Sequence, residues 1–177
     1  MAPTQAVIRM IERRDHLLMH RVHRWLAPRW VRLWMIAATR GGDGWLWYAL
    51  GLALLILGGE QGRRAVLQSS LAAGFGVALF LWMKRATRRR RPCAIQPHCW
   101  ATLLPPDHFS FPSGHTITAF AVAGPVIAGM PGSAPGVLFC AFSIAASRVL
   151  LGMHFLSDVL AGAAIGSLLG WVALMLI

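Results

Sequence analysis

Five long apolar stretches dominate this sequence of 177 residues and limit what it can fold into. They cover residues 44–59, 65–83, about 116–130, about 134–151 and 156–177. A helix needs roughly 20 apolar residues to cross the hydrocarbon core of a bilayer, with about 17 as the lower end. The first and third stretches therefore need residues from their flanks. Because only helices and closed barrels satisfy their backbone polar groups in lipid, the sequence predicts an all-α, polytopic membrane helical bundle with about five to six transmembrane helices.

The N-terminal region differs because arginines are interleaved with its apolar side chains. Residues 5–27 repeat apolar side chains at helical spacing, and five arginines lie between them: Arg9, Arg13, Arg14, Arg21 and Arg24. This pattern is typical of an amphipathic helix in the membrane interface. A second short interfacial piece follows Pro28, and the N-terminus lacks the continuous apolar segment of a cleavable signal peptide. We expect one membrane-embedded domain over residues 1–177, with an interfacial amphipathic region at 1–43 and a helical core at 44–177.

The charge balance narrows the classes of partner. The chain has 17 Lys and Arg against 6 Asp and Glu, a formal net charge of +11, while 56% of its residues are hydrophobic. Such a balance suits anionic lipid, phosphate esters or nucleic acid. Nucleic acid is disfavoured, because no zinc-finger, RNA-recognition or helix-turn-helix pattern occurs and the basic residues interrupt membrane-length segments. We therefore expect membrane lipids and a phosphate-bearing ligand as partners, and no nucleic acid.

A long polar connection at residues 84–115 stands apart from the apolar stretches. Long ordered loops are uncommon unless they are functional. The connection begins with six cationic side chains in eight positions. Lys84 and Arg91 are candidates to neutralise a phosphoryl group, and Arg89 is a candidate auxiliary contact. The other cations fit a solvated positive flank: Arg85, Arg88 and Arg90.

Two of the three cysteines, Cys93 and Cys99, lie in this connection. They can pair if the loop faces an oxidising compartment, and two free thiols are an equal alternative. Cys140 lies in an apolar stretch, where packing explains it.

The sequence FPSGHT, residues 111–116, starts the third apolar stretch. Ser113 occupies the position of a helix N-cap, and Gly114 leaves its N–H exposed. The first N–H groups of a helix are unpaired and its dipole favours negative charge, so such a helix start is an anion site. His115 in the first turn would face whatever binds there. Plain helix capping is the alternative for this motif taken alone.

A third motif, SRVLLGMHFLSD at residues 147–158, precedes the last apolar stretch. The spacing of His154 and Asp158 puts both on one face of a helix. A carboxylate in that place can hold the Nδ1–H of the imidazole and leave Nε2 free as a nucleophile or base. Arg148 lies in apolar surroundings, where an arginine is costly and is normally paired or functional. A helix-end cap and a snorkelling arginine are the alternatives.

Together the three motifs point to one reaction, the transfer of a phosphoryl group to a histidine. No HExxH sequence, cluster of carboxylates or Cys/His ligand spacing is present in the sequence to hold a metal. We therefore expect no metal and no cofactor.

The same residues resemble the type-2 phosphatidic acid phosphatase superfamily of membrane lipid phosphate phosphatases. The resemblance rests on three motifs in order: Lys84-x6-Arg91-Pro92, Pro112-Ser113-Gly114-His115 and Ser147-Arg148-x5-His154-x3-Asp158. It implies a single phosphatase domain in which His154 attacks phosphorus, Asp158 orients His154, and His115 protonates the leaving oxygen. It also implies a set of phosphate-binding residues: Lys84, Arg91, Ser113, Gly114 and Arg148.

The resemblance implies an integral membrane enzyme that hydrolyses a phosphomonoester or pyrophosphate on a lipid through a phosphohistidine. Candidate substrates are undecaprenyl pyrophosphate, phosphatidylglycerophosphate, phosphatidic acid and lipid A phosphates. Two alternatives stay open: a lipid phosphotransferase that uses the same site, and a non-enzymatic protein that binds anionic lipids through its arginines.

The family resemblance implies that the protein lies in a bacterial inner (cytoplasmic) membrane, with its active site at the periplasmic face. The arginines of residues 1–43 favour the cytoplasm instead under the positive-inside rule. With five crossings, the two placements agree only if part of residues 5–40 also crosses or re-enters the membrane. We expect the periplasmic face that the family implies, because the phosphate site explains the basic run better than topology does.

Overall fold

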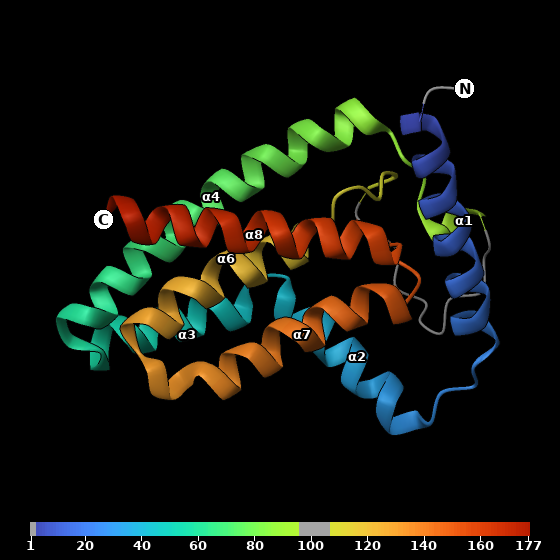
Figure 1. Ribbon diagram of the computed structural model, residues 1–177. Helices are drawn as coiled ribbons and strands as arrows, with labels where there is room; N and C mark the ends of the chain where they lie inside the picture. The colour runs from blue at the N-terminus through green and yellow to red at the C-terminus, as the bar shows by residue number, and fades with distance from the viewer. Residues whose placement is uncertain (1–2, 96–106) are drawn as a thin grey trace.

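The computed structural model describes residues 3–95 and 107–177. Every regular element in these ranges is helical, which confirms the all-α prediction. Figure 1 shows the helices in chain order. Their bounds are α1 Pro3–Arg24, α2 Arg29–Gly42, α3 Trp45–Leu57, α4 Gly59–Thr87, α5 Pro92–Ile95, α6 Gly114–Gly129, α7 Ala134–Leu150 and α8 Leu156–Leu176, with a 3₁₀ turn η1 at Pro131–Ser133.

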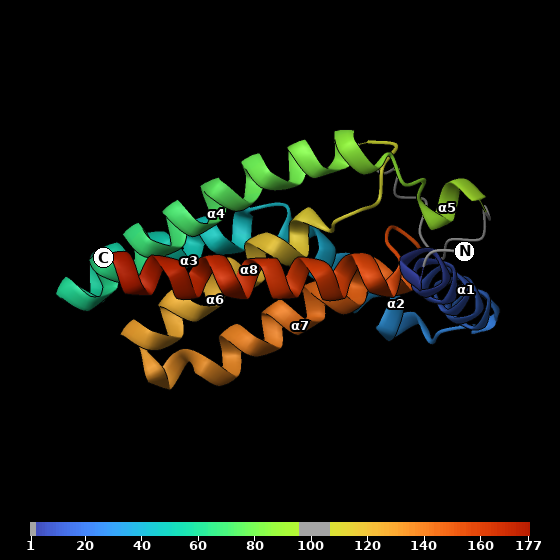
Figure 2. The same cartoon turned by 45° about the horizontal axis from the view of Figure 1, so that its top comes forward.

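The longer helices form a bundle along one axis (Figures 1 and 2). Within the described residues, three helical segments are long and apolar enough to cross a membrane: α4, the combined η1–α7 segment Pro131–Leu150, and α8. Two shorter apolar helices, α3 and α6, belong to the same bundle. The predicted polytopic membrane bundle is therefore confirmed as a fold class, while the number of crossings stays a prediction.

Helix α1 lies across one end of this bundle rather than along it (Figures 1 and 2). At the same end, α4 finishes and α6 and α8 begin. Met19 of α1 is buried against Phe155 and Val159 at the start of α8, whereas most other described side chains of α1 are exposed. Helix α1 thus matches the predicted amphipathic helix, and its buried side is attached to the start of α8.

Helix α4 is longer than the apolar stretch at 65–83 suggested. It begins directly after α3 and continues through Lys84. Lys84 and Arg85 in its last turn suit the negative end of the helix dipole. Arg88 then ends the helix in the left-handed conformation, with φ 50°. The polar connection therefore begins later than residue 84, and Lys84 is fixed on a helix rather than in a loop.

Helices α6 and α8 approach each other closely because α8 carries glycines at every fourth position. A Cβ atom at Gly166 would lie 2.3 Å from the backbone oxygen of Ile117, and one at Gly162 would lie 2.8 Å from that of Ser113. Gly170 continues the stripe. Small residues at this spacing allow membrane helices to pack with their backbones in contact. The stripe brings the start of α6 against the start of α8, where two of the three sequence motifs lie.

Candidate active site

A polar cavity of about 220 Å³ lies where the three motifs meet. Its lining includes Asp43, Asp107 and Thr118, which the sequence did not single out. Ser113 and Asp158 do not line it. The other predicted site residues all do: Lys84, Arg91, Gly114, His115, Arg148 and His154.

Three cationic side chains in this cavity are almost fully buried: Lys84, Arg91 and Arg148. Arg91 is held on two sides, since its Nε donates to the carbonyl oxygen of Asp107 and its Nη1 to that of Met153, both at 2.8 Å. The buried Nε of Arg148 makes no hydrogen bond within the described residues. Buried cations around one cavity repel one another unless an anion joins them. The arrangement is therefore suited to hold an anion with several oxygens.

Asp107 supplies an anion to this group of cations. Its Oδ2 lies 2.6 Å from Nζ of Lys84, and its Oδ1 lies 2.8 Å from Nη2 of Arg91. Burial raises the pKa of this carboxyl, but the hydrogen bonds from Lys84 and Arg91 outweigh burial and lower the pKa to about 2. The carboxylate oxygens of Asp107 thus mark places where oxygens of a bound phosphate can be held.

His154 is buried in the wall of the cavity, with its Nε2 3.1 Å from Nη1 of Arg91. A guanidinium can only donate hydrogen bonds, so Nε2 carries the lone pair and the ring proton is on Nδ1. Nδ1 lies 3.7 Å from Oδ2 of Asp158, which is longer than a hydrogen bond. Burial lowers the pKa of His154 well below its ordinary value, and the nearby Arg148 and Arg91 lower it further. The protein therefore holds a neutral imidazole with its lone pair at the cation cluster.

His115, in the first turn of α6, is paired with Asp43 in the turn between α2 and α3. Its Nε2 lies 2.7 Å from Oδ1 of Asp43. Gly42 permits this approach, because a Cβ there would lie 3.0 Å from Cδ2 of His115. A carboxylate at this distance accepts the Nε2–H and orients the ring. Asp43 is therefore a candidate to hold His115 in place.

Ser113 is at the N-cap of α6, as predicted, but it does not face the cavity. It is fully buried, its Oγ accepts a hydrogen bond from Oγ1 of Thr116 (2.9 Å), and its N–H donates to the carbonyl oxygen of Asp158 (3.1 Å). Gly114 does line the cavity, and a Cβ there would lie 3.1 Å from the ring of Phe80. Gly114 is thus placed to meet a ligand, whereas Ser113 ties the start of α6 to α8.

Asp158 lies behind His154 and is fully buried. Its Oδ2 accepts a hydrogen bond from the Phe155 N–H (2.8 Å), and its Oδ1 accepts one from Nη1 of Arg89 (2.6 Å). The sequence suggested Arg89 as an auxiliary phosphate contact. That expectation is corrected, because Arg89 does not line the cavity and its guanidinium binds the carboxylates of Asp158 and Asp15.

The most informative signal that sequence reasoning did not use is the scarcity of carboxylates. The chain has only 6 Asp and Glu, so each is expected to have a role in so basic and apolar a chain. Four of them lie within hydrogen-bonding distance of a basic side chain at this end of the bundle: Asp15, Asp43, Asp107 and Asp158.

Two further expectations concern ligands and cysteines. In residues 3–95 and 107–177, no three His, Cys, Asp or Glu side chains gather in a way that could hold a metal ion. Cys99 lies outside the described residues, so its pairing with Cys93 stays a prediction.

Comparison with known proteins agrees with the resemblance found in the motifs. The model of the PAP2 superfamily matches residues 65–177. The decaprenylphosphoryl-5-phosphoribose phosphatase of Mycobacterium tuberculosis is 31% identical over 140 residues, which cover 77% of each chain. Among solved structures, LpxE of Aquifex aeolicus superposes with a TM-score of 0.70 at 26% identity and covers 89% of this chain and 93% of its own.

A second solved structure supports the fold alone. The transmembrane PAP2-type phosphatidylglycerolphosphate phosphatase of Bacillus subtilis has a TM-score of 0.72 at 24% identity, and the match covers 94% of this chain and 85% of the other. The region that matches the family contains all three motifs and more than half of the chain. The chain therefore belongs to the PAP2 superfamily and is an integral membrane phosphatase.

Proposed function

We propose that this protein hydrolyses a phosphate group from a membrane lipid through a phosphohistidine formed at His154. The observation that carries the proposal is the position of Nε2, which lies 3.1 Å from Nη1 of Arg91 on a residue that lines the same cavity as the buried cations Lys84, Arg91 and Arg148. A phosphoryl group in this cavity has its oxygens neutralised by the cations while its phosphorus lies within reach of the nucleophile.

The residues suggest an order of bond changes. Nε2 of His154 forms a bond to phosphorus while the bond from phosphorus to the lipid oxygen breaks. His115 enters this step as an imidazolium paired with Asp43, gives its second ring proton to the leaving oxygen and becomes neutral. The phosphorylated imidazole is cationic, and the Asp158 carboxylate beside Nδ1 compensates its charge. Water then attacks phosphorus and gives a proton back to His115, the phosphorus–nitrogen bond breaks, and inorganic phosphate leaves.

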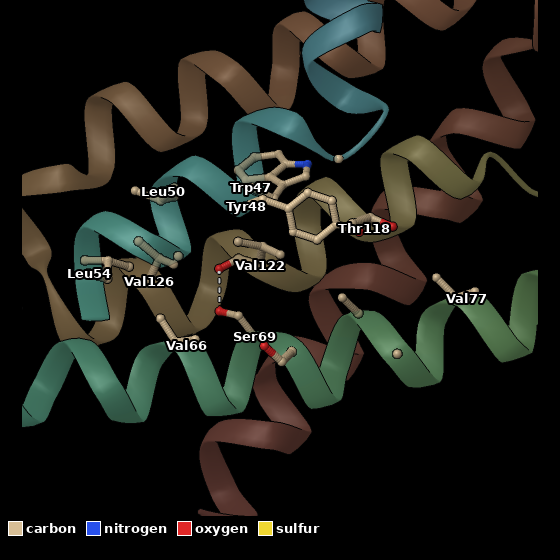
Figure 3. A pocket seen from close by; sticks show the side chains of 15 residues that line it. Trp47, Tyr48, Leu50, Leu54, Val66, Ser69, Val77, Thr118, Val122 and Val126 are labelled. Atoms are coloured by element: carbon tan, nitrogen blue, oxygen red, sulfur yellow. Dashed lines mark hydrogen bonds between the residues drawn. The ribbon is translucent and has the colours of Figure 1, made fainter. Parts of the chain in front are cut away.

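An apolar cavity of about 330 Å³ supports a lipid as the substrate. It lies between α3, α4 and α6, and the side chains around it include Trp47, Tyr48, Leu54 and Val122 (Figure 3). Thr118 borders both this cavity and the polar one. A molecule with a phosphate head and an apolar tail can therefore occupy both cavities at once. Polyprenyl-linked phosphates are the first substrates to test, because the Mycobacterium tuberculosis relative is named for a decaprenyl-linked one.

The test is phosphate release by the purified protein in detergent micelles. The substrates are decaprenyl and undecaprenyl phosphates and pyrophosphates, phosphatidylglycerophosphate, phosphatidic acid and a lipid A phosphate. We expect release with a chelator present and competitive inhibition by vanadate, which mimics five-coordinate phosphorus. His154→Ala is expected to lower kcat by at least about 10³-fold. A rapid quench with ³²P-labelled substrate is expected to trap label on the protein that acid removes and alkali does not.

Arg85→Gln is the matched control, because Arg85 is exposed next to Lys84 and does not line the cavity. Activity that survives His154→Ala contradicts the nucleophile assignment, and activity that is lost with chelator contradicts a metal-free reaction. A phosphorylated lipid in place of free phosphate identifies a phosphotransferase. A function that depends on the exposed arginines and not on His154 identifies a lipid-binding protein.

We also propose that the protein lies in a bacterial cytoplasmic membrane with the active-site end of the bundle facing the periplasm. The family resemblance supports this face. Lys84 and Arg91 of the basic run line the proposed phosphate cavity, so the site accounts for positive charge at this end. The positive-inside rule taken alone favours the cytoplasm for the exposed arginines of α1, which lies across the active-site end.

A further inference from the structure

Arg89 is the centre of a polar network that lies outside the phosphate cavity. Its Nη1 donates to Oδ1 of Asp158 (2.6 Å) and to the Ser157 hydroxyl (2.7 Å), and its Nη2 donates to Oδ2 of Asp15 (2.7 Å). The guanidinium also lies 4.4 Å from the centre of the Phe155 ring, a cation–π contact that adds to its fixation. One side chain thus joins a carboxylate of the first helix to a carboxylate of the last.

Asp15 connects this network to α1. It is 5% exposed, and its Oδ1 accepts a hydrogen bond from the Ser157 N–H (3.2 Å) while its Oδ2 accepts one from the Ser157 hydroxyl. Close by, Met19 of α1 packs against Phe155. The first turn of α8, which carries Asp158, is therefore fastened to α1 by both polar and apolar contacts.

The environment of Asp158 explains why this network matters for the reaction. An unpaired charge in a buried place is strongly destabilising, so the Asp158 carboxylate needs compensation. The Phe155 N–H donates a hydrogen bond to Oδ2, and the Arg89 guanidinium donates one to Oδ1 and brings the compensating positive charge. With Oδ1 held by Arg89, Oδ2 is the oxygen on the side of His154, 3.7 Å from its Nδ1. A shift of less than about 1 Å would bring these two atoms within hydrogen-bonding distance (roughly 2.7–3.2 Å).

We propose that Arg89 and Asp15 are positioning residues for catalysis. Arg89 holds the Asp158 carboxylate in line with His154, and Asp15 holds Arg89. Helix α1 then contributes to catalysis through Asp15, in addition to its place at the membrane interface. The inference rests on the proposed function, in which His154 is the nucleophile. Because Arg89 does not line the phosphate cavity, removing the network is expected to change kcat and to leave phosphate binding unchanged.

The test compares Asp15→Asn, Arg89→Gln and Arg89→Lys in the full chain in detergent micelles. Asp15→Asn and Arg89→Gln are expected to lower kcat about 10- to 100-fold, the scale found when the partners that orient metal-binding side chains are removed. KM and the inhibition constant of inorganic phosphate, a ground-state ligand of the cavity, are expected to stay unchanged. Arg89→Lys keeps the charge but reaches fewer partners, so its kcat is expected to lie between wild type and Arg89→Gln. The double variant Asp15→Asn/Arg89→Gln is expected to be no slower than Arg89→Gln, since both act through one network.

Glu12→Gln, on the exposed side of α1, and Arg90→Gln, beside Arg89, are the matched controls and are expected to keep wild-type kcat. Wild-type kcat in Asp15→Asn and Arg89→Gln overturns the inference, provided that His154→Ala and Asp158→Asn are inactive. If those two variants are active, the proposed function fails instead. A rise in KM with kcat unchanged also overturns the inference. If Arg89→Gln does not fold, the test relies on Asp15→Asn and Arg89→Lys. Wild-type kcat in both of these variants overturns the inference.

Discussion

Asp107 occupies the place where the substrate phosphate is proposed to bind. Its carboxylate contacts both Lys84 and Arg91, and a pKa of about 2 keeps it ionised at physiological pH. A phosphate that enters the cavity must therefore displace Asp107 from two cations. The free protein avoids an uncompensated cluster of cations in this way, and the cost is weaker binding of its ligand.

Asp107→Asn is expected to bind vanadate more tightly, because an amide competes less well than a carboxylate for Lys84 and Arg91. The expected fall in the inhibition constant is on the order of fivefold, since a partly exposed ion pair is worth ~1 kcal/mol or less. The gain is expected to be constant between about pH 5 and 8, because Asp107 is ionised throughout that range. Glu60→Gln, which removes an exposed carboxylate at the far end, is the control. Weaker vanadate binding by Asp107→Asn would mean that Asp107 orders the cavity for its ligand.

The pKa of His154 gives a second prediction for a single residue. Burial and the neighbouring arginines lower this pKa below the ordinary value of about 6.5, so protons bind only at lower pH and the nucleophile stays neutral. In protein labelled with ¹³C-histidine, the His154 ring signal is expected to stay at its neutral position as the pH falls through about 6.5, where an ordinary imidazole is half protonated. His154→Gln assigns the signal. A titration midpoint at or above about 6.5 would contradict the structural account.

Residues that interrupt an apolar pattern could be predicted from the sequence, and their partners could not. His154 and Arg148 stand out because charge and imidazole are costly beside membrane helices. Asp43 and Asp107 lie in a turn and a loop, where local spacing says nothing about the side chains that folding brings near. For Ser113, the cap position was evident, but the direction of its hydroxyl depends on the contact with α8.

Among the elements, α8 carries the most specific packing feature, its glycine stripe. At Gly166 a Cβ would lie 2.3 Å from the Ile117 oxygen, whereas at Gly136 of α7 it would meet nothing within 4 Å. Gly166→Ala is therefore expected to destabilise the protein by about 1–3 kcal/mol through overpacking, and Gly136→Ala is expected to keep wild-type stability. Unfolding in micelles measures both. Equal stability of the two variants would show that α6 and α8 can separate without loss.

Helix positions followed well from the apolar pattern where that pattern was continuous. The stretches at 134–151 and 156–177 correspond closely to α7 and α8. Helix α4 was underestimated because charged residues extend it at both ends, where side-chain pairing and the helix dipole sustain a helix outside lipid. The α6–α8 contact could not be derived from periodicity, because a glycine leaves the same gap in the pattern whether it faces lipid or a neighbouring helix.

For the whole molecule, the sharpest prediction concerns sidedness. If the active-site end faces the periplasm, the C-terminal end of α8 lies on the cytoplasmic side, because it is at the opposite end of the bundle (Figure 1). A green fluorescent protein fused after Ile177 is then expected to fluoresce, and an alkaline phosphatase fused there is expected to be inactive. The reverse pattern would support the cytoplasmic face that the positive-inside rule favours for the N-terminal arginines.

The position of Thr118 between a polar and an apolar cavity has a consequence for kinetics. A substrate that spans this boundary never leaves the plane of the bilayer, whereas its phosphate departs into water. The enzyme then meets its substrate in two dimensions, and its rate follows the mole fraction of lipid phosphate among the surrounding lipids rather than the amount per volume. Inert lipid slows such an enzyme by surface dilution, and its two products separate into different phases as they are released.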